Sequence, residues 1–219
     1  MIRGSAIVVV AACASALNEP SPISAFAPGH AEGRTIDELV RDGDAAWVRR
    51  DEPGQAAAAQ ALYLDAAAAD DHGVVALLRA MRAMSFRIER EHRSDLVSEQ
   101  VQLGQWCRRH APTNGECDYR FAIALGQQAR ERSSTAKDAI GKMVDLLHHA
   151  IVTVPRIDNA GPHRVLALVL LHAPAWPLGP GDLDAAVDEA RAAVAMFPDA
   201  PDNQRVLAEA LAARAETSR

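Results

Sequence analysis

Four sets of residues, most of them small or apolar, recur at nearly constant spacing along the chain. Within each set the members stand at positions i, i+4 and i+7, which share one face of a helix, and a turn residue follows five positions later. The turn residues are Asp71, Pro112, Pro155 and Pro198, 41 to 43 residues apart. The sets are Ala59, Tyr63 and Ala66; Gln100, Gly104 and Cys107; Met143, Leu147 and Ala150; and Ala186, Ala190 and Ala193. Such a period predicts stacked helical hairpins, each burying one face against the next.

The composition favours helices and argues against several other classes of protein. Alanine supplies 45 of the 219 residues, whereas alternating runs of β-branched and aromatic residues, which strands need, are missing. With 49% hydrophobic and 24% charged residues, the chain has the composition of a globular protein. Its net charge of −6 argues against a general nucleic-acid binder, which requires a clustered basic face.

Helix signals divide residues 35–219 into about nine helices. Capping residues are expected at Thr35, Thr113, Thr135 and Asp182, where a side-chain oxygen can accept a free backbone N–H. The expected helices span 36–47, 53–70, 73–90, 94–110, 113–132, 135–154, 162–173, 182–197 and 201–215. The sequence therefore predicts one all-α domain of stacked helical hairpins with short connections.

The first 34 residues differ from the rest of the chain. Arg3, the apolar run 6–12 and the small residues after it are typical of a secretory signal peptide, expected over residues 1–16. Two processing schemes fit this segment. Cys13 follows Val-Ala-Ala as in a bacterial lipobox, which would make it the lipidated first residue of the mature chain, whereas Ala14-Ser15-Ala16 offers an ordinary cleavage site. The proline-containing segment 17–34 is expected to be a flexible tether.

The hairpin frame resembles the tetratricopeptide repeat (TPR). In that motif, small residues on the second helix of one hairpin let the first helix of the next approach closely, and a proline closes the hairpin. The period here exceeds the usual repeat of about 34 residues, so the helices or loops must be longer. The fold that this resemblance implies is a degenerate TPR-like solenoid.

Four segments resemble bacterial TPR-type lipoproteins related to the T component of TRAP transporters, and the resemblance covers residues 42–213. Its motifs are Cys117-x-Tyr119-x-x-Ala122-x-Ala124-Leu125-Gly126, Asp158-x-Ala160-Gly161-Pro162-x-Arg164, Ala173-Pro174-x-Trp176-Pro177-x-Gly179-x-Gly181-Asp182 and Pro198-Asp199-x-Pro201-x-Asn203. It implies a scaffold or transport accessory that contacts a protein partner, in the sharpest version a periplasmic solute-binding receptor. The alternative is a periplasmic carrier that holds a small apolar or organic-acid ligand in its helical groove.

The signal segment and its lipobox-like cysteine, Cys13, set the expected location. The protein would lie on the periplasmic face of the outer membrane through its lipid anchor, or in the soluble periplasm. The anchor would be its only membrane contact, and self-association stays open. No His-Glu-x-x-His, Gly-x-Ser-x-Gly or Walker A pattern occurs, so we expect no catalysis and no cofactor.

Six residues are candidates for the partner or ligand groove. Arg164 stands inside an apolar helix and needs a carboxylate partner, for which Asp158 and Asp182 are available. Trp176 lies in a loop rich in proline and glycine, and is expected either to plug the core or to form a wall of the groove. The candidates are Tyr119, Asp158, Arg164, Trp176, Asp182 and Asn203.

Cys107 and Cys117 flank the turn at Pro112. A disulfide across this turn is reasonable in an oxidising periplasm, and two buried thiols are the alternative. With His110 they would supply only three metal ligands and no Cys-x-x-Cys pair, so no metal site is expected.

Overall fold

The computed structural model of the chain describes residues 21–29, 31, 33–70, 73–131 and 136–217. These residues form nine α-helices and two short 3-10 helices, with no strand among them, which confirms the predicted all-α class. In chain order the elements are η1 (Ile23–Ala25), α1 (Ile36–Val48), α2 (Gln55–Ala68), α3 (Val74–Arg90), η2 (Ser94–Leu96), α4 (Val97–His110), α5 (Gly115–Glu131), α6 (Ala136–Thr153), α7 (Ile157–His172), α8 (Leu183–Met196) and α9 (Pro201–Thr217).

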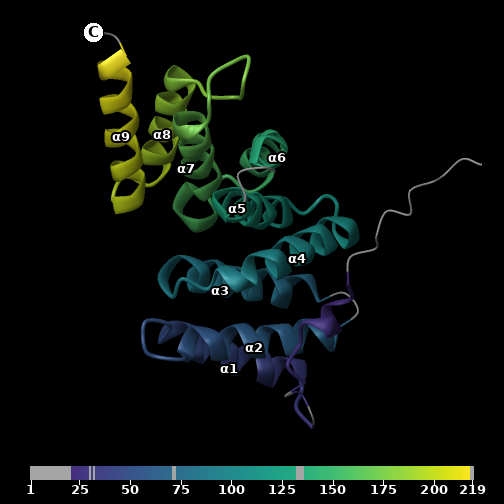
Figure 1. Ribbon diagram of the computed structural model, residues 1–219. Coiled ribbons are helices and arrows are strands. Elements are labelled where there is room, and N and C mark those ends of the chain that lie inside the picture. The colour runs from purple at the N-terminus through teal and green to yellow at the C-terminus, as the bar shows by residue number, and fades with distance from the viewer. Residues whose placement is uncertain (1–20, 30, 32, 71–72, 132–135, 218–219) are drawn as a thin grey trace, which may run out of the picture.

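The helices pair into hairpins that stack along the molecule, from α1 and α2 at one end to α8 and α9 at the other (Figure 1). Each helix packs against the next one along the chain, and α3 with α5, α5 with α7 and α7 with α9 also touch. The first helices of successive hairpins, α1, α3, α5 and α7, therefore lie side by side as in a solenoid. Among the described residues, no helix has the length and apolar character that crossing a membrane requires.

Burial on the second helix of each hairpin explains the stacking. All twelve repeat positions on α2, α4, α6 and α8 are buried, including Gln100. Gly104 shows why one of them is small, because a Cβ atom there would lie 2.5 Å from Cδ2 of Phe121 on α5. Gly43 on α1 is close to Tyr63 of α2 in the same way, with 2.7 Å between its ideal Cβ position and Cε1. Small residues thus permit the close helix approach that the repeat predicts.

Two of the predicted caps are confirmed. Thr35 and Glu38 form a reciprocal capping box at the start of α1, and Asp182 Oδ1 accepts the backbone N–H groups of Asp184 and Ala185 at the start of α8. The prediction for Thr113 is wrong, because Asn114 Oδ1 accepts the N–H of Glu116 instead. Thr135 lies outside the described residues.

The expected tether differs from its structure over the residues that can be described. From Ser21 onward the segment lies against the hairpins: Ile23 is buried, and Phe26, Ala27 and Ala31 pack against the core beside it. The backbone N–H of Gly29 donates to Asp65 of α2 at 2.9 Å. Apolar side chains within the segment cover α2, which is the reason that this part is not an extended linker. Cys13, the signal segment 1–16 and residues 17–20 lie outside the described residues.

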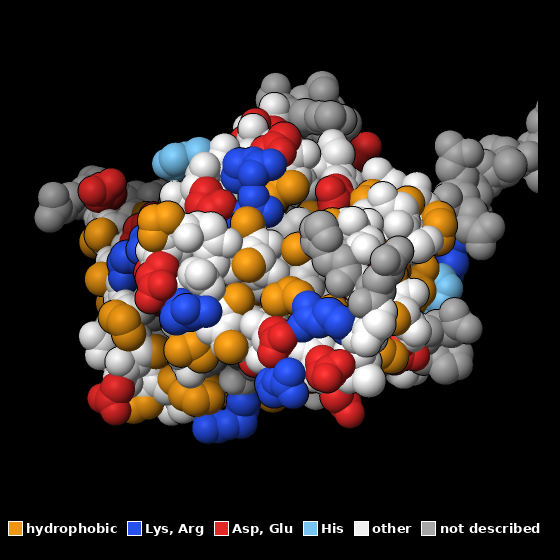
Figure 2. Space-filling model, turned by 90° about the horizontal axis from the view of Figure 1, so that it is seen from below, with side chains coloured by type: hydrophobic (Ala, Val, Ile, Leu, Met, Phe, Trp, Pro, Cys, Tyr) orange, Lys and Arg blue, Asp and Glu red, His pale blue; other side chains and the backbone are white. Residues whose placement is uncertain are grey.

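The end of the stack at α1 and α2 has a mixed surface. Acidic and basic side chains are interspersed there with hydrophobic ones, and neither sign of charge dominates the face in view (Figure 2). Such a polar outer face is typical of the terminal repeat of a solenoid, which meets water where inner repeats meet a neighbour.

Candidate functional site

The first helices of four hairpins enclose a groove of about 490 Å³, here called the α1–α7 groove. Charged residues dominate its lining, three of them acidic and three basic, and three aliphatic side chains also line it. Its residues are Asp44, Val75, Leu78, Arg79, Arg82, Asn114, Glu116, Arg120, Ile157 and Asp158. Concave surfaces of this kind are where repeat proteins bind their partners.

Arg82 of α3 lines the α1–α7 groove and has no ion-pair partner among the described residues. Its guanidinium carbon lies 4.5 Å from the centre of the Trp47 ring on α1, a cation–π geometry. Its Nε is buried without a hydrogen-bond partner, and in the described part of the chain no hydrogen bond or ion pair joins its guanidinium to another residue. A buried donor without an acceptor costs about 1–3 kcal/mol, so this group favours an incoming acceptor.

The other charges at this end of the groove are paired within it. Arg79 contacts the Asp44 carboxylate at 2.6 Å, and the Tyr63 hydroxyl donates to the same carboxylate at 2.7 Å. Burial raises the pKa of Tyr63, and the hydrogen bond to Asp44 raises it further. Tyr63 therefore stays a neutral donor that fixes Asp44 beside Arg79.

Arg120 of α5 binds two carboxylates on the opposite wall. Its guanidinium contacts Glu116 at 3.0 Å and Asp158 at 2.6 Å, and the side chain is only 5% exposed. Tyr119 is buried next to it, and burial raises the pKa of the Tyr119 phenol, with the negative charge of Asp158 raising it further. Arg79 and Arg120 thus form ion pairs with carboxylates of the groove. Among the described residues, Arg82 forms none.

Asp158 is presented to the groove by a left-handed turn at the start of α7. Asp158, Asn159 and Ala160 have φ values of 48°, 56° and 62° in succession, a conformation that costs about 1–2 kcal/mol for each non-glycine residue. Arg164 donates from Nη1 to the carbonyls of Asp158 (3.0 Å) and Asn159 (3.2 Å), and Asn203 of α9 donates to Asn159 at 3.0 Å. These bonds stabilise the turn.

This arrangement corrects the partner expected for Arg164. Neither the Asp158 nor the Asp182 carboxylate receives it, since Asp158 pairs with Arg120 and Asp182 caps α8. The third acceptor of Arg164 is Oδ1 of Asn203 at 2.9 Å. Asn203 is fully buried and also donates to the carbonyls of Ala193 and Phe197. Its hydrogen bonds therefore connect α7, α8 and α9.

Of the six sequence candidates, the structure brings four together and separates two. Tyr119, Asp158, Arg164 and Asn203 surround the left-handed turn, and the Tyr119 hydroxyl lies against Gly161. Asp182 serves as a helix cap outside both the groove and the turn. Trp176 is 86% exposed, so the prediction that it plugs the core is wrong, and it lines neither the α1–α7 groove nor the second cavity described next.

A second cavity of about 690 Å³, here called the α5–α7 pocket, lies between the carboxyl half of α5, α6 and α7. Its aliphatic lining includes Ile123, Met143, Val165, Leu168 and Val169. Ionisable side chains also line it, namely Glu89, Tyr119, Arg130, Arg164, His172 and Arg205. A cavity of this size with apolar walls and a few polar groups suits a small amphipathic molecule.

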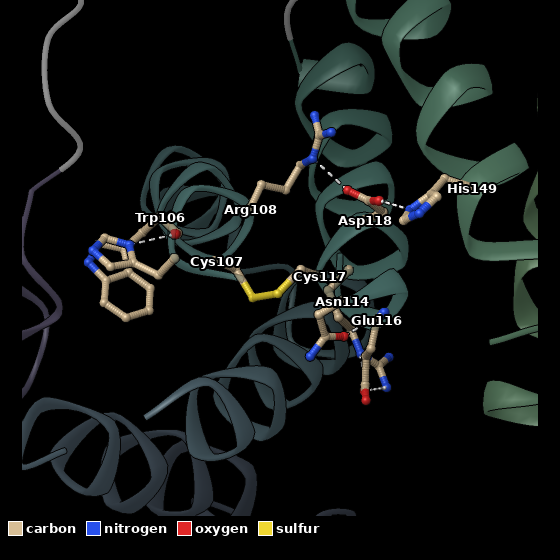
Figure 3. The surroundings of a disulfide bond; sticks show 10 residues. Trp106, Cys107, Arg108, Asn114, Glu116, Cys117, Asp118 and His149 are labelled. Carbon is tan, nitrogen blue, oxygen red and sulfur yellow. Dashed lines mark hydrogen bonds and ion pairs between the residues drawn. A yellow bond between two sulfur atoms is a disulfide. The ribbon is translucent and has the colours of Figure 1, made fainter. Parts of the chain in front are cut away.

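A disulfide joins Cys107 of α4 to Cys117 of α5, with 5.5 Å between the Cα atoms (Figure 3). The adjoining Asp118 is buried and lies between Arg108 (2.5 Å) and His149, which belongs to α6 (Figure 3). The bond and this ion-pair cluster fasten the second and third hairpins together. Since both cysteines are in the disulfide, neither supplies a thiolate nucleophile or metal ligand, and no group of three metal-ligating side chains occurs in the described ranges.

Sequence reasoning missed the most informative residues, Trp47, Arg79 and Arg82. A signal for two of them was present: Val75, Arg79 and Arg82 stand at i, i+4 and i+7 on α3, so they share a face distinct from its buried one. Their pairing with α1 could not be read from spacing, because it depends on how two hairpins sit against each other.

Known proteins do not identify the chain. It matches no protein-family model, and no curated protein matches it. The resemblance carried by the motifs between Cys117 and Asn203 therefore stays a prediction.

Proposed function

We propose that this protein is a non-catalytic, TPR-like binding protein that holds an extended segment of a partner protein in the α1–α7 groove. The observation that carries this proposal is Arg82, a guanidinium without an acid, supported by Trp47 and open to the groove. Its natural complement is a carboxylate of the partner, either an acidic side chain or a chain terminus.

The remaining groove lining suits an extended peptide better than a compact ligand. Acidic and basic side chains both line the groove, and Val75, 68% exposed, adds an apolar contact. A peptide backbone carries donors and acceptors along its length and can pair with both kinds of charge. Arg82, which lines the groove and stacks on the Trp47 ring, is also of a residue type that is common in binding hot spots.

Arg82→Gln should weaken peptide binding about tenfold, because it removes one charge-assisted hydrogen bond. Peptides selected on the intact protein from a displayed random library would be titrated by fluorescence anisotropy, and we expect an acidic residue or free carboxyl terminus among them. Arg50→Gln is the matched control: Arg50 stacks on the same Trp47 ring at 4.9 Å but does not line the groove. Equal affinity of wild type and Arg82→Gln for every selected peptide would refute the proposal.

The cellular role that fits this site is an envelope scaffold, with a T component of a TRAP-type uptake system as the sharpest version. This part of the proposal rests on the sequence resemblance and on the expected signal segment with Cys13. A photo-crosslinking residue at Val75, which faces the groove, would capture the partner in cells. A periplasmic solute-binding receptor among groove-dependent products would support the transport role, and its absence would leave the scaffold without it.

A carrier function is the second candidate, favoured by the α5–α7 pocket. Among the residues that the structure describes, Arg164 donates only from Nη1, to three acceptors, so Nε and Nη2 can receive a ligand carboxylate. We expect a dansyl-labelled fatty acid to bind with enhanced fluorescence. Leu168→Glu should weaken it about tenfold by placing a like charge on the apolar wall, whereas Val152→Glu, at an exposed valine outside the pocket, should not. No fluorescence change with the wild type would exclude this candidate.

A further inference from the structure

The connection between α7 and α8 exposes an apolar surface that neither cavity uses. Residues 173–181 read Ala-Pro-Ala-Trp-Pro-Leu-Gly-Pro-Gly and contain no charged side chain. Trp176 is 86% exposed and Leu178 67%, and the intervening Pro177 is exposed as well. In Figure 1 the connection projects beyond the ends of α7 and α8. Soluble proteins rarely leave such a continuous apolar segment in water without a use for it.

Most backbone N–H groups of this connection are either absent or bonded within the protein. Pro174, Pro177 and Pro180 have no N–H, and the N–H groups of five other residues donate to backbone carbonyls within the protein. Those five are Ala173, Leu178, Gly179, Gly181 and Asp182. Gly181 donates to Pro174 at 2.9 Å, which closes the loop at its base. Backbone groups that are removed or already bonded are the condition for entering a medium without hydrogen-bonding partners.

Size and charge favour a lipid surface over a protein as the occupant. A specific protein interface buries about 800 Å² on each partner with some 20–30 residues, which is more than the exposed residues 174–178 of the connection supply. A bilayer instead admits a projecting tip without requiring a complementary shape. Tryptophan, with an apolar body and one N–H, is enriched at the boundary between headgroups and acyl chains. Because the chain carries a net charge of −6, the matching surface is an uncharged one.

We propose that the α7–α8 connection is a membrane-contact loop that inserts Trp176 and Leu178 into the interfacial region of a zwitterionic bilayer. The loop touches the bilayer from one side and does not cross it. This contact is separate from the α1–α7 groove and does not depend on lipidation of Cys13. It would orient the stack of hairpins relative to the membrane, which a flexible attachment alone cannot do.

Quenching of Trp176 by brominated lipid tests the proposal on the full-length chain. The probe is phosphatidylcholine vesicles that contain lipids brominated near the headgroup. The chain has three tryptophans, so the difference between wild type and Trp176→Phe reports Trp176 alone, whether or not another segment binds the vesicles. We expect the Trp176 emission to shift to the blue and to be quenched, while the residual emission of Trp47 and Trp106 in Trp176→Phe is not.

Leu178→Ser should raise the lipid concentration for half-maximal quenching of Trp176 about fivefold or more, because it removes apolar area that inserts with it. Val48→Ser is the matched control: this valine of α1 is 77% exposed but lies at the other end of the stack (Figure 1). Equal quenching of wild type and Trp176→Phe, or quenching that requires anionic lipid, would overturn the proposal. The first outcome would leave a pocket of a partner protein as the binding site for the loop, and the second would replace the zwitterionic surface by an anionic one.

Discussion

Replacement of Asn203 by alanine should destabilise the carboxyl-terminal helices by about 3 kcal/mol. The substitution removes the Asn203 amide as a second donor to the carbonyls of Asn159, Ala193 and Phe197, and it removes one acceptor from Arg164. Each of these lost hydrogen bonds contributes about 0.5–1.5 kcal/mol, and together they give a loss of about 3 kcal/mol. Urea unfolding followed by circular dichroism measures the loss, and amide hydrogen exchange should show α8 and α9 opening before the other hairpins.

The neighbouring residue supplies the control for this experiment. Gln204 makes one exposed bond, from Nε2 to the carbonyl of Pro198, so Gln204→Ala should change the free energy of unfolding by less than about 0.5 kcal/mol. If the free energy of unfolding of Asn203→Ala is also within about 0.5 kcal/mol of the wild type, the hydrogen bonds of Asn203 do not stabilise the packing of the last three helices.

Removal of the disulfide should cost a comparable amount. The double substitution Cys107→Ala and Cys117→Ala releases a cross-link over a sequence separation of 10, and the loop-entropy relation gives about 2–3 kcal/mol for a loop of that length. Both side chains are fully buried, so the lost sulfur atoms also leave space in the core. The midpoint of urea unfolding should fall accordingly, with little change in its slope.

A reductant separates the cross-link from the packing effect. Reduction should lower the unfolding midpoint of the wild type and leave that of the double variant unchanged. Alkylation of the unfolded, unreduced protein followed by peptide mass spectrometry should find Cys107 and Cys117 unlabelled. Labelling of both would show that the cysteines are free thiols in solution and would contradict this prediction.

The sequence predicted the helices and their stacking well, because both depend on local signals. All twelve residues at the i, i+4 and i+7 positions of the second helices are buried as predicted, and Thr35 and Asp182 mark two helix starts. The prediction of Thr113 as a helix cap is wrong because Asn114, one residue later, takes this position and has the stronger capping preference.

The candidate site was only partly predictable, because it forms between hairpins. Arg82 and Trp47 meet across α1 and α3, and no local pattern relates the two. The prediction for Trp176 is wrong for another reason. An aromatic residue in a rigid loop indicates a contact, but the sequence does not say whether the contact is with this chain or with another molecule. Arg164 was expected to seek a carboxylate, whereas a left-handed turn supplied carbonyl oxygens that serve the same purpose.

The left-handed turn of Asp158 to Ala160 belongs to two parts of the molecule at once. The Asp158 carboxylate lines the α1–α7 groove. The Asp158 carbonyl accepts from Arg164, and the Asn159 carbonyl accepts from Asn203 of α9. Any ligand that engages Asp158 more strongly in the native turn also favours the packed state of α9. By thermodynamic reciprocity, whatever loosens α9 weakens that ligand by the same factor. Fraying of α9 would therefore lower the affinity of the α1–α7 groove for that ligand, although α9 does not line the groove.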